Sequence, residues 1–183
     1  MTLSPSHPAD EGKMLLDIAA ERGITLIDAL FDVLHDDRFE TLCVMHSMSE
    51  DDVENLMVWR RTMIGSDGLF APGGRMAHPR CYGTFPRFLG RYARDKALLP
   101  PEEAIRKITA MPAAVYGLST KGLIRVGMDA DLTLFDEKAL IDNADYQNFN
   151  AKNSGIAKVF VNGTVVVEDN LYNGRMPGRL LRK

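Results

Sequence analysis

The chain has 183 residues, of which 45% are hydrophobic and 26% are charged, and its net charge is −3. This is the composition of a globular protein with a core, and it excludes a disordered, collagen-like or disulfide-stapled chain. No apolar run reaches 18 residues, the N-terminus lacks the features of a signal peptide, and the two cysteines show no CxxC spacing. We therefore expect a cytoplasmic protein that does not enter a membrane.

The first third of the chain is predicted to be largely helical. Apolar side chains between Met14 and Ala19 share one helical face, and Gly23 ends that run. Thr25 is a predicted N-cap for a second helix that reaches Leu34, with an acidic residue three positions after the cap.

A strand–helix–strand unit is predicted next. Short apolar runs at residues 39–45 and 62–64 favour strands that are covered on both faces, and Ser49 begins a helix between them. Such a unit pairs its strands in parallel, and in parallel sheets chemistry lies at the carboxyl ends of the strands. Asp67 follows the second predicted strand and lies at such an end.

A Gly/Pro-rich loop at residues 68–81 separates this unit from further helices. Loops of this length are commonly functional or without fixed structure. Pro86 is predicted in the first turn of a helix that runs to about residue 96, and Pro101 is predicted to begin the next helix. Pro112 is expected to end or kink that helix, and Gly117 to stop the helical region.

The pattern changes to β after Gly117. Residues 131–135 alternate in polarity, and residues 159–167 predict a hairpin around Asn162-Gly163, a strong turn signal. We therefore place a boundary near residue 118, with α/β structure before it and all-β structure after it.

Asp67 and Arg80 are the leading candidates for chemistry. A carboxylate at a strand end could bind a metal or transfer a proton, although Asp-Gly is also an ordinary turn dipeptide. Arg80 follows a proline on the Gly-rich loop and could bind a carboxylate through its guanidinium; the alternative is a solvated surface arginine. His78 could donate a hydrogen bond or pack the loop, and His46 lies near the same predicted sheet edge or has a structural role.

The sequence gives less support to two other chemistries. The four histidines form neither a His-x-His nor an HExxH pattern, so no complete zinc site is predicted. Residues 59–125 hold twelve basic and four acidic residues, whereas residues 1–58 hold three basic and thirteen acidic ones. The basic segment is a candidate nucleic-acid patch, but attraction between the two segments within one fold is the preferred interpretation, and we predict no nucleic-acid partner.

Several motifs together resemble the C-terminal part of the D-aminoacylase (N-acyl-D-amino-acid deacylase) family of the amidohydrolase superfamily. The most specific of these motifs lie between residues 65 and 91: they are the sequences GSDG, HPRCYGTFPR and LGR. The similarity covers nearly all of residues 10–183. Residues 103–113 resemble the family's last barrel helix, and the motifs after residue 127 resemble its closing β segment.

This resemblance implies a fold and a site. The fold is α/β: the C-terminal part of a metal-dependent hydrolase (β/α)8 barrel in residues 1–117, followed by a small all-β domain in residues 118–183. Asp67 corresponds to the aspartate that takes a proton from a metal-bound water, passes it to the leaving amine and shares in metal binding. Arg80 corresponds to the arginine that holds the α-carboxylate of the substrate, and Ser66 and His78 are further substrate-binding candidates.

The resemblance also implies zinc as cofactor, an N-acyl-D-amino acid as substrate, and an incomplete chain. Full members are much longer, and their metal-binding histidines and cysteine come from earlier strands that this sequence lacks. We expect little activity from the chain alone, and a companion chain or self-association that covers exposed barrel edges. A non-catalytic remnant or oligomerising module is the alternative. The deacylase interpretation requires that Asp67 follow a paired strand and face the mouth of the barrel.

Overall fold

The computed structural model describes residues 1–69, 78–146 and 148–181. The helical elements in chain order are η1 (Pro8–Asp10), α1 (Leu15–Arg22), α2 (Leu26–Asp36), α3 (Glu50–Val58), α4 (Arg80–Arg87), η3 (Phe88–Asp95), α5 (Pro101–Ile108) and α6 (Ala110–Tyr116). The strands are β1 (Leu132–Phe135), β2 (Ile156–Val161), β3 (Thr164–Glu168) and β4 (Leu171–Tyr172). No described helix is long and apolar enough to cross a membrane.

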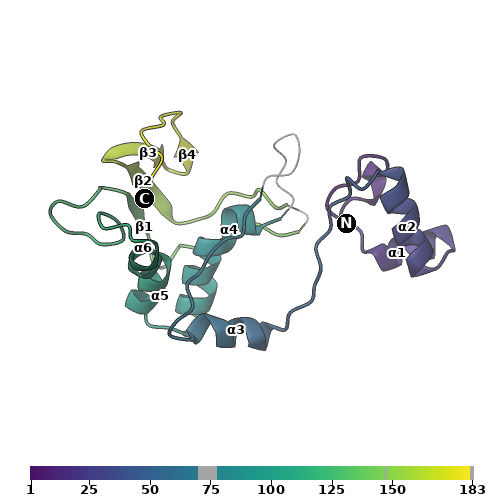
Figure 1. The fold of residues 1–183 in the computed structure, drawn as a ribbon, viewed down its shortest axis with the longest axis horizontal. Coiled ribbons are helices and arrows are strands. Elements are labelled where there is room, and N and C mark those ends of the chain that lie inside the picture. Colours follow the sequence, from purple (N-terminus) through teal and green to yellow (C-terminus); the bar gives the residue numbers. More distant parts are fainter. Residues whose placement is uncertain (70–77, 147, 182–183) are drawn as a thin grey trace.

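Helices α1 and α2 form a small unit at the N-terminus that lies apart from the rest of the chain (Figure 1). Its core contains Ile18 from α1 together with Ala29 and Val33 from α2, all nearly inaccessible to solvent. Thr25 caps α2 by accepting a hydrogen bond from the Asp28 amide, as the sequence predicts. An extended segment leads from this unit to α3.

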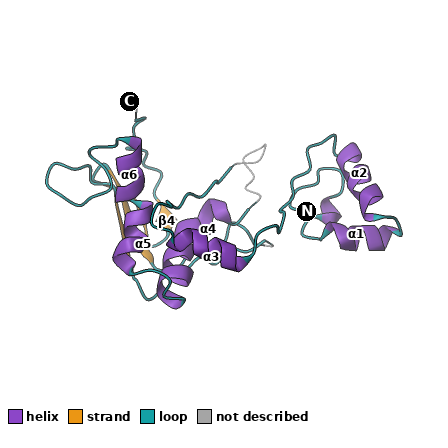
Figure 2. Cartoon of the chain, turned by 60° about the horizontal axis from the view of Figure 1, so that its bottom comes forward, coloured by secondary structure: helices purple, strands orange, loops and turns teal. Residues whose placement is uncertain are grey.

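The second body of helices is built around α4 and η3, which continue one another. Phe88, Tyr92 and Ala93 of η3 and Ala104 of α5 form its buried core. The two views in Figures 1 and 2 place α3 beside α4 and α5 beside this helical body. The predicted start of this helix at Pro86 is wrong, because the helix begins at Arg80 and Pro86 lies inside it.

The C-terminal third forms a four-stranded antiparallel sheet with the strands in chain order. The predicted hairpin is confirmed, since Asn162 and Gly163 join β2 to β3 with φ values of 47° and 75°. Positive φ at both positions is the geometry of a type I′ turn, which suits Asn-Gly. Strand β1 confirms the predicted strand at residues 131–135, and the boundary near residue 118 stays a prediction.

The predicted strand–helix–strand unit is wrong in its strands. Residues 39–45 contribute only an antiparallel bridge between Leu42 and Leu3, and residues 62–64 form no strand. The Ile64 amide instead donates to the Lys107 carbonyl at 3.4 Å. A buried parallel strand needs neighbours on both sides. In the described part of the chain, residues 39–45 meet only Leu3 at this one bridge, and residues 62–64 have no strand neighbour. The helix between them, α3, is confirmed with its Ser49 N-cap.

Candidate functional site

Asp67 and Arg80 meet at the beginning of α4. The Arg80 Nη2 atom lies 3.0 Å from the Asp67 Oδ2 atom, and the two side chains are 37% and 78% exposed, respectively. Asp67 has a φ of 45°, a left-handed conformation that costs energy for a residue with a Cβ. The predicted surroundings of Asp67 are therefore not met in this chain, because its carboxylate is largely exposed and the preceding residues are not paired in a sheet.

The Arg80 side chain is less exposed than that of Asp67. Arg80 is the first residue of α4, and its Nε atom is buried with no hydrogen-bond partner in the described structure. A buried donor without a partner loses hydration that nothing replaces, so an anion that reached this nitrogen would gain a charged hydrogen bond. The arrangement suits the binding of a carboxylate.

His78 lies directly before α4 and shapes its start. Its Nδ1 atom accepts a hydrogen bond from the Arg80 amide at 3.0 Å, which leaves the proton of a neutral imidazole on Nε2. Burial, and then the positive charges of Arg80 and Arg87, lower the pKa of His78, so the neutral form is favoured. His78 is thus able to donate through Nε2 near Arg80.

Tyr146 is a neighbour of this site that the sequence did not indicate. Its ring contacts His78 edge-on at a centroid distance of 5.4 Å and His46 at 5.0 Å. The structure therefore brings together residues that three distant segments supply. A single tyrosine in a polar stretch gives no sequence signal for such a role.

Ser66 has a local role in the structure. Its hydroxyl oxygen accepts a hydrogen bond from the Gly68 amide at 3.2 Å. This contact tightens the turn that carries Asp67. The hydroxyl remains available as a donor, so its predicted contact with substrate stays a prediction.

The described residues do not fit a metal ion by themselves. They contain no group of three or more His, Cys, Asp or Glu side chains that could hold one. Asp67 contacts a guanidinium, and the Cys81 thiol donates to the Leu69 carbonyl at 3.4 Å. Zinc needs three or four protein ligands, so the predicted share of Asp67 in metal binding requires ligands from elsewhere.

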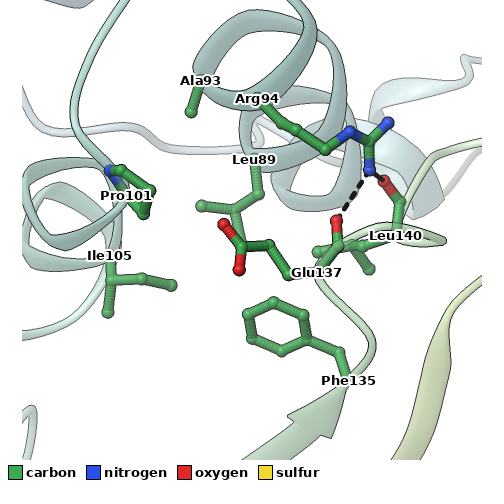
Figure 3. A pocket seen from close by; sticks show the side chains of 8 residues that line it. All are labelled: Leu89, Ala93, Arg94, Pro101, Ile105, Phe135, Glu137 and Leu140. Carbon is green, nitrogen blue, oxygen red and sulfur yellow. Dashed lines mark hydrogen bonds between the residues drawn. The ribbon is translucent and has the colours of Figure 1, made fainter. Parts of the chain in front are cut away.

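Two arginines fix the helix that begins with Arg80 against the segment after β1. Arg87 contacts the nearly buried Asp142 carboxylate at 2.7 Å and donates to the Ala144 carbonyl at 3.1 Å. Arg94 donates to the carbonyls of Glu137 and Leu140 at 2.9 and 2.7 Å (Figure 3). The C-terminal part of the chain therefore holds α4 and η3 in place.

Figure 3 also shows a cavity between η3, α5 and the end of β1. Its volume is about 320 Å³, and its lining is mainly apolar: Leu89, Ala93, Arg94, Pro101, Ile105, Phe135, Glu137 and Leu140. Neither Asp67 nor Arg80 lines it. The cavity is separate from the candidate site.

Comparison with known proteins identifies the class to which this fold and site belong. Residues 60–167 match the model of the amidohydrolase family. The chain belongs to the amidohydrolase family.

Within that family the chain is similar to N-acyl-D-amino-acid deacylases. It is 38% identical over 183 residues to the D-aminoacylase of Alcaligenes xylosoxydans xylosoxydans, covering 100% of this chain and 36% of the relative. It is 36% identical over 187 residues to the N-acyl-D-glutamate deacylase of the same organism, again covering 36% of the relative. The chain thus spans about a third of the length of the curated relatives it matches.

Solved structures give the same result. A crystal structure of D-aminoacylase is 36% identical with a TM-score of 0.80, and the match covers 95% of this chain and 35% of that one. The N-acyl-D-Glu deacylase of Bordetella bronchiseptica, complexed with zinc and a phosphonate inhibitor, is 34% identical with a TM-score of 0.82, covering 100% of this chain and 37% of that one. The predicted fold class, a portion of a D-aminoacylase-type amidohydrolase, is confirmed.

Proposed function

We propose that this chain supplies the proton-transferring carboxylate and the substrate-binding arginine of an N-acyl-D-amino-acid deacylase once the remaining strands of the barrel, which come from other protein, pair with the segment before Asp67 and cover its carboxylate. The reaction is hydrolysis of the amide bond to a carboxylate and a free D-amino acid. The observation that carries the proposal is the contact between Asp67 and Arg80 inside the segment that matches the amidohydrolase model. The names of the relatives support the substrate class.

In this proposal the two side chains have separate tasks. Asp67 accepts a proton from the water that attacks the amide carbonyl and returns it to the leaving amine. Arg80 binds the α-carboxylate of the substrate through its guanidinium, which fixes the position of the stereocentre relative to the attacking water. His78, with its proton on Nε2, donates a further hydrogen bond to the substrate.

The complete enzyme needs more protein than this chain. We infer that zinc belongs to the complete site and that this chain alone binds none tightly, because its described residues lack a set of ligands. The relative from Bordetella bronchiseptica contains zinc, and a D-aminoacylase has a binuclear metal centre. The free cysteines Cys43 and Cys81 support a reducing, cytoplasmic setting for the assembled protein.

Complementation tests this proposal. The chain is produced together with the part of the Alcaligenes D-aminoacylase that it does not cover, and hydrolysis of N-acetyl-D-amino acids is measured with added zinc. We expect turnover from the pair, none from either part alone, and a preference for D over L substrates. Rapid turnover by this chain alone would overturn the inference that it is incomplete.

An Asp67→Asn variant provides the test of the proton-transfer role. In the complemented enzyme we expect kcat to fall by about 10²–10⁴-fold, the range for loss of a general acid–base group. Asp51→Asn is the matched control, since Asp51 is an exposed carboxylate on α3. Equal activity of the two variants would rule out the role assigned to Asp67.

We also propose that a companion chain, or a second copy, covers the apolar surface of this protein. Large apolar side chains are widely exposed, among them Phe31, Phe39, Met45 and Trp59, which are 64%, 80%, 81% and 57% exposed. Apolar exposure on this scale marks interaction surfaces. This observation is also what favours the alternative function, a non-catalytic oligomerising module.

Light scattering after size-exclusion chromatography separates the two functions. For the deacylase part we expect an association that becomes a defined complex when the complementing part is added. For the module we expect a stable homo-oligomer that neither takes up the complementing part nor binds zinc. A well-behaved monomer at all concentrations would contradict both.

A further inference from the structure

Lys107 is a buried lysine that the proposed reaction does not use. It lies in the last turn of α5, and its exposed fraction is 0%. Its Nζ atom donates to the carbonyls of Trp59 and Thr62 at 2.6 and 2.9 Å. A buried ammonium is costly unless hydrogen bonds compensate for its lost hydration, and these two bonds do so. Burial also lowers the pKa of Lys107.

The two accepting carbonyls lie where α3 ends and the chain turns toward Asp67. Helix α3 ends at Val58, its last turn contains no basic residue, and Trp59 already has an extended backbone. The carbonyl end of a helix carries partial negative charge, which a nearby cation stabilises. Lys107 supplies this cation from another helix.

The backbone of Lys107 makes a further contact with the segment that follows α3. Its carbonyl accepts the hydrogen bond from the Ile64 amide at 3.4 Å, and the Ile64 side chain packs against the core around Phe88. The segment from Trp59 to Ile64 is therefore tied to α5 at three positions. Only Gly65 and Ser66 separate its end from Asp67.

We propose that Lys107 is a positioning residue for Asp67: by binding the Trp59 and Thr62 carbonyls it fixes the irregular segment that carries the carboxylate toward Arg80. This inference rests on the proposed function for the catalytic importance of Asp67. The placement of the segment itself is measurable without any activity.

The test compares Lys107→Met with Ile108→Val in the full chain. Met fills a similar volume but leaves both carbonyls without a donor, whereas Ile108→Val removes one methyl group from the neighbouring core position. Lys107→Gln, which keeps a donating amide, is measured in parallel. Hydrogen exchange over residues 59–68 and the fluorescence anisotropy of Trp59, the single tryptophan, report on the segment.

We expect Lys107→Met to speed exchange in residues 59–68 by at least tenfold and to lower the Trp59 anisotropy, while α1 and α2 stay protected. Lys107→Gln is expected to give a smaller change in the same peptides, and Ile108→Val to leave them unchanged. If Lys107→Met does not fold, the comparison of Lys107→Gln with Ile108→Val decides the matter in the same way. Equal changes in the lysine variants and Ile108→Val would overturn the positioning role.

Activity then separates the two proposals. In the complemented enzyme we expect Lys107→Gln to lower kcat without raising KM, since Asp67 is displaced while Arg80 stays free to bind the substrate carboxylate. If exchange responds as expected but kcat does not fall, Lys107 positions the segment and the role assigned to Asp67 is wrong. If exchange does not respond, the positioning role fails whatever the activity.

Discussion

The carboxylate of Asp67 contacts the guanidinium of Arg80 at 3.0 Å, although twelve residues separate the two in the sequence. In the proposed reaction these groups act at different ends of the substrate. A substrate carboxylate that binds Arg80 must therefore compete with Asp67 or share the guanidinium with it. Binding of substrate and release of Asp67 for proton transfer are coupled through this one ion pair.

Replacement of Arg80 tests this coupling. We expect Arg80→Gln to raise KM in the complemented enzyme by about 30–150-fold, because one charged hydrogen-bonding contact to the substrate is worth roughly 2–3 kcal/mol. The free energy of unfolding should change by less than about 1 kcal/mol, since the pair with Asp67 is largely exposed. Steady-state kinetics and denaturant unfolding provide the two measurements.

Arg91→Gln is the control for this substitution. Arg91 forms an exposed pair with Glu50 and not with Asp67. Its loss should leave KM unchanged. A similar KM for Arg80→Gln and the wild type would show that the substrate carboxylate binds elsewhere.

The sequence predicts those features that depend on neighbouring residues. Thr25 and Ser49 cap the helices expected of them, and Gly117 ends α6 with a φ of 72°. The Asn162-Gly163 turn fixes the hairpin. In each case the hydrogen bond or the backbone angle involves residues within one turn of each other, so local sequence carries the information.

Features that depend on distant partners are predicted less well. The apolar runs at residues 39–45 and 62–64 read as strands, but a strand exists only where another strand pairs with it. For the site, the motif resemblance indicated Asp67 and Arg80, whereas Tyr146 approaches His46 and His78 only through the folding of a remote segment. Lys107 likewise gives no sign of its partners, because a lysine in an amphipathic helix normally faces water.

The ion pair between Arg87 and Asp142 predicts a clear stability effect. The Asp142 side chain is only 4% exposed, so removal of the guanidinium leaves a desolvated carboxylate. Breaking a fully buried pair costs about 3–5 kcal/mol. Because the Arg87 side chain is 40% exposed, we expect Arg87→Gln to lower the free energy of unfolding by less, roughly 2–3 kcal/mol. Arg106→Gln breaks an exposed pair with Glu103 on α5 and should cost less than about 1 kcal/mol. Equal losses of unfolding free energy in Arg87→Gln and Arg106→Gln, measured by denaturant unfolding, would show that the pair with Asp142 does not hold α4 in place.

The close packing of Gly90 in η3 against the segment after β1 leads to a prediction about steric strain. A Cβ added at Gly90 would lie 2.2 Å from the Leu140 carbonyl oxygen, whereas one at Gly65 would meet no atom within 4 Å. Since the neighbour is backbone and cannot rotate away, we expect Gly90→Ala to lower the free energy of unfolding by about 3 kcal/mol, at the upper end for overpacking. Gly65→Ala should be nearly neutral. Thermal unfolding of both variants checks this, and a stable Gly90→Ala variant would mean that the segment after β1 is not held this closely.

The surroundings of Asp37 lead to a prediction of how the stability of the N-terminal unit, α1 and α2, changes at low pH. Its side chain is nearly buried and accepts hydrogen bonds from the hydroxyls of Ser4 and Thr41 and from the Ser6 amide at 2.7, 2.6 and 2.8 Å. Burial alone would raise the pKa of Asp37, but these hydrogen bonds outweigh it and hold the pKa below its ordinary value. The ionised form is therefore bound more favourably in the folded unit than in the unfolded chain.

The sign of the pH dependence follows from this lowered pKa. The stabilisation is fully present above the unfolded pKa of about 3.9 and is lost as pH falls through the lower folded value. We expect the helicity of α1 and α2 to melt at progressively lower temperature below about pH 4. Asp37→Asn should weaken this dependence and cost roughly 2–3 kcal/mol at neutral pH; part of the dependence should remain, because hydrogen-bonded cations also lower the pKa values of Asp10 and Asp36. Asp32→Asn on the exposed face of α2 should change neither quantity. An unaltered pH profile in Asp37→Asn would show that another carboxylate controls the unit.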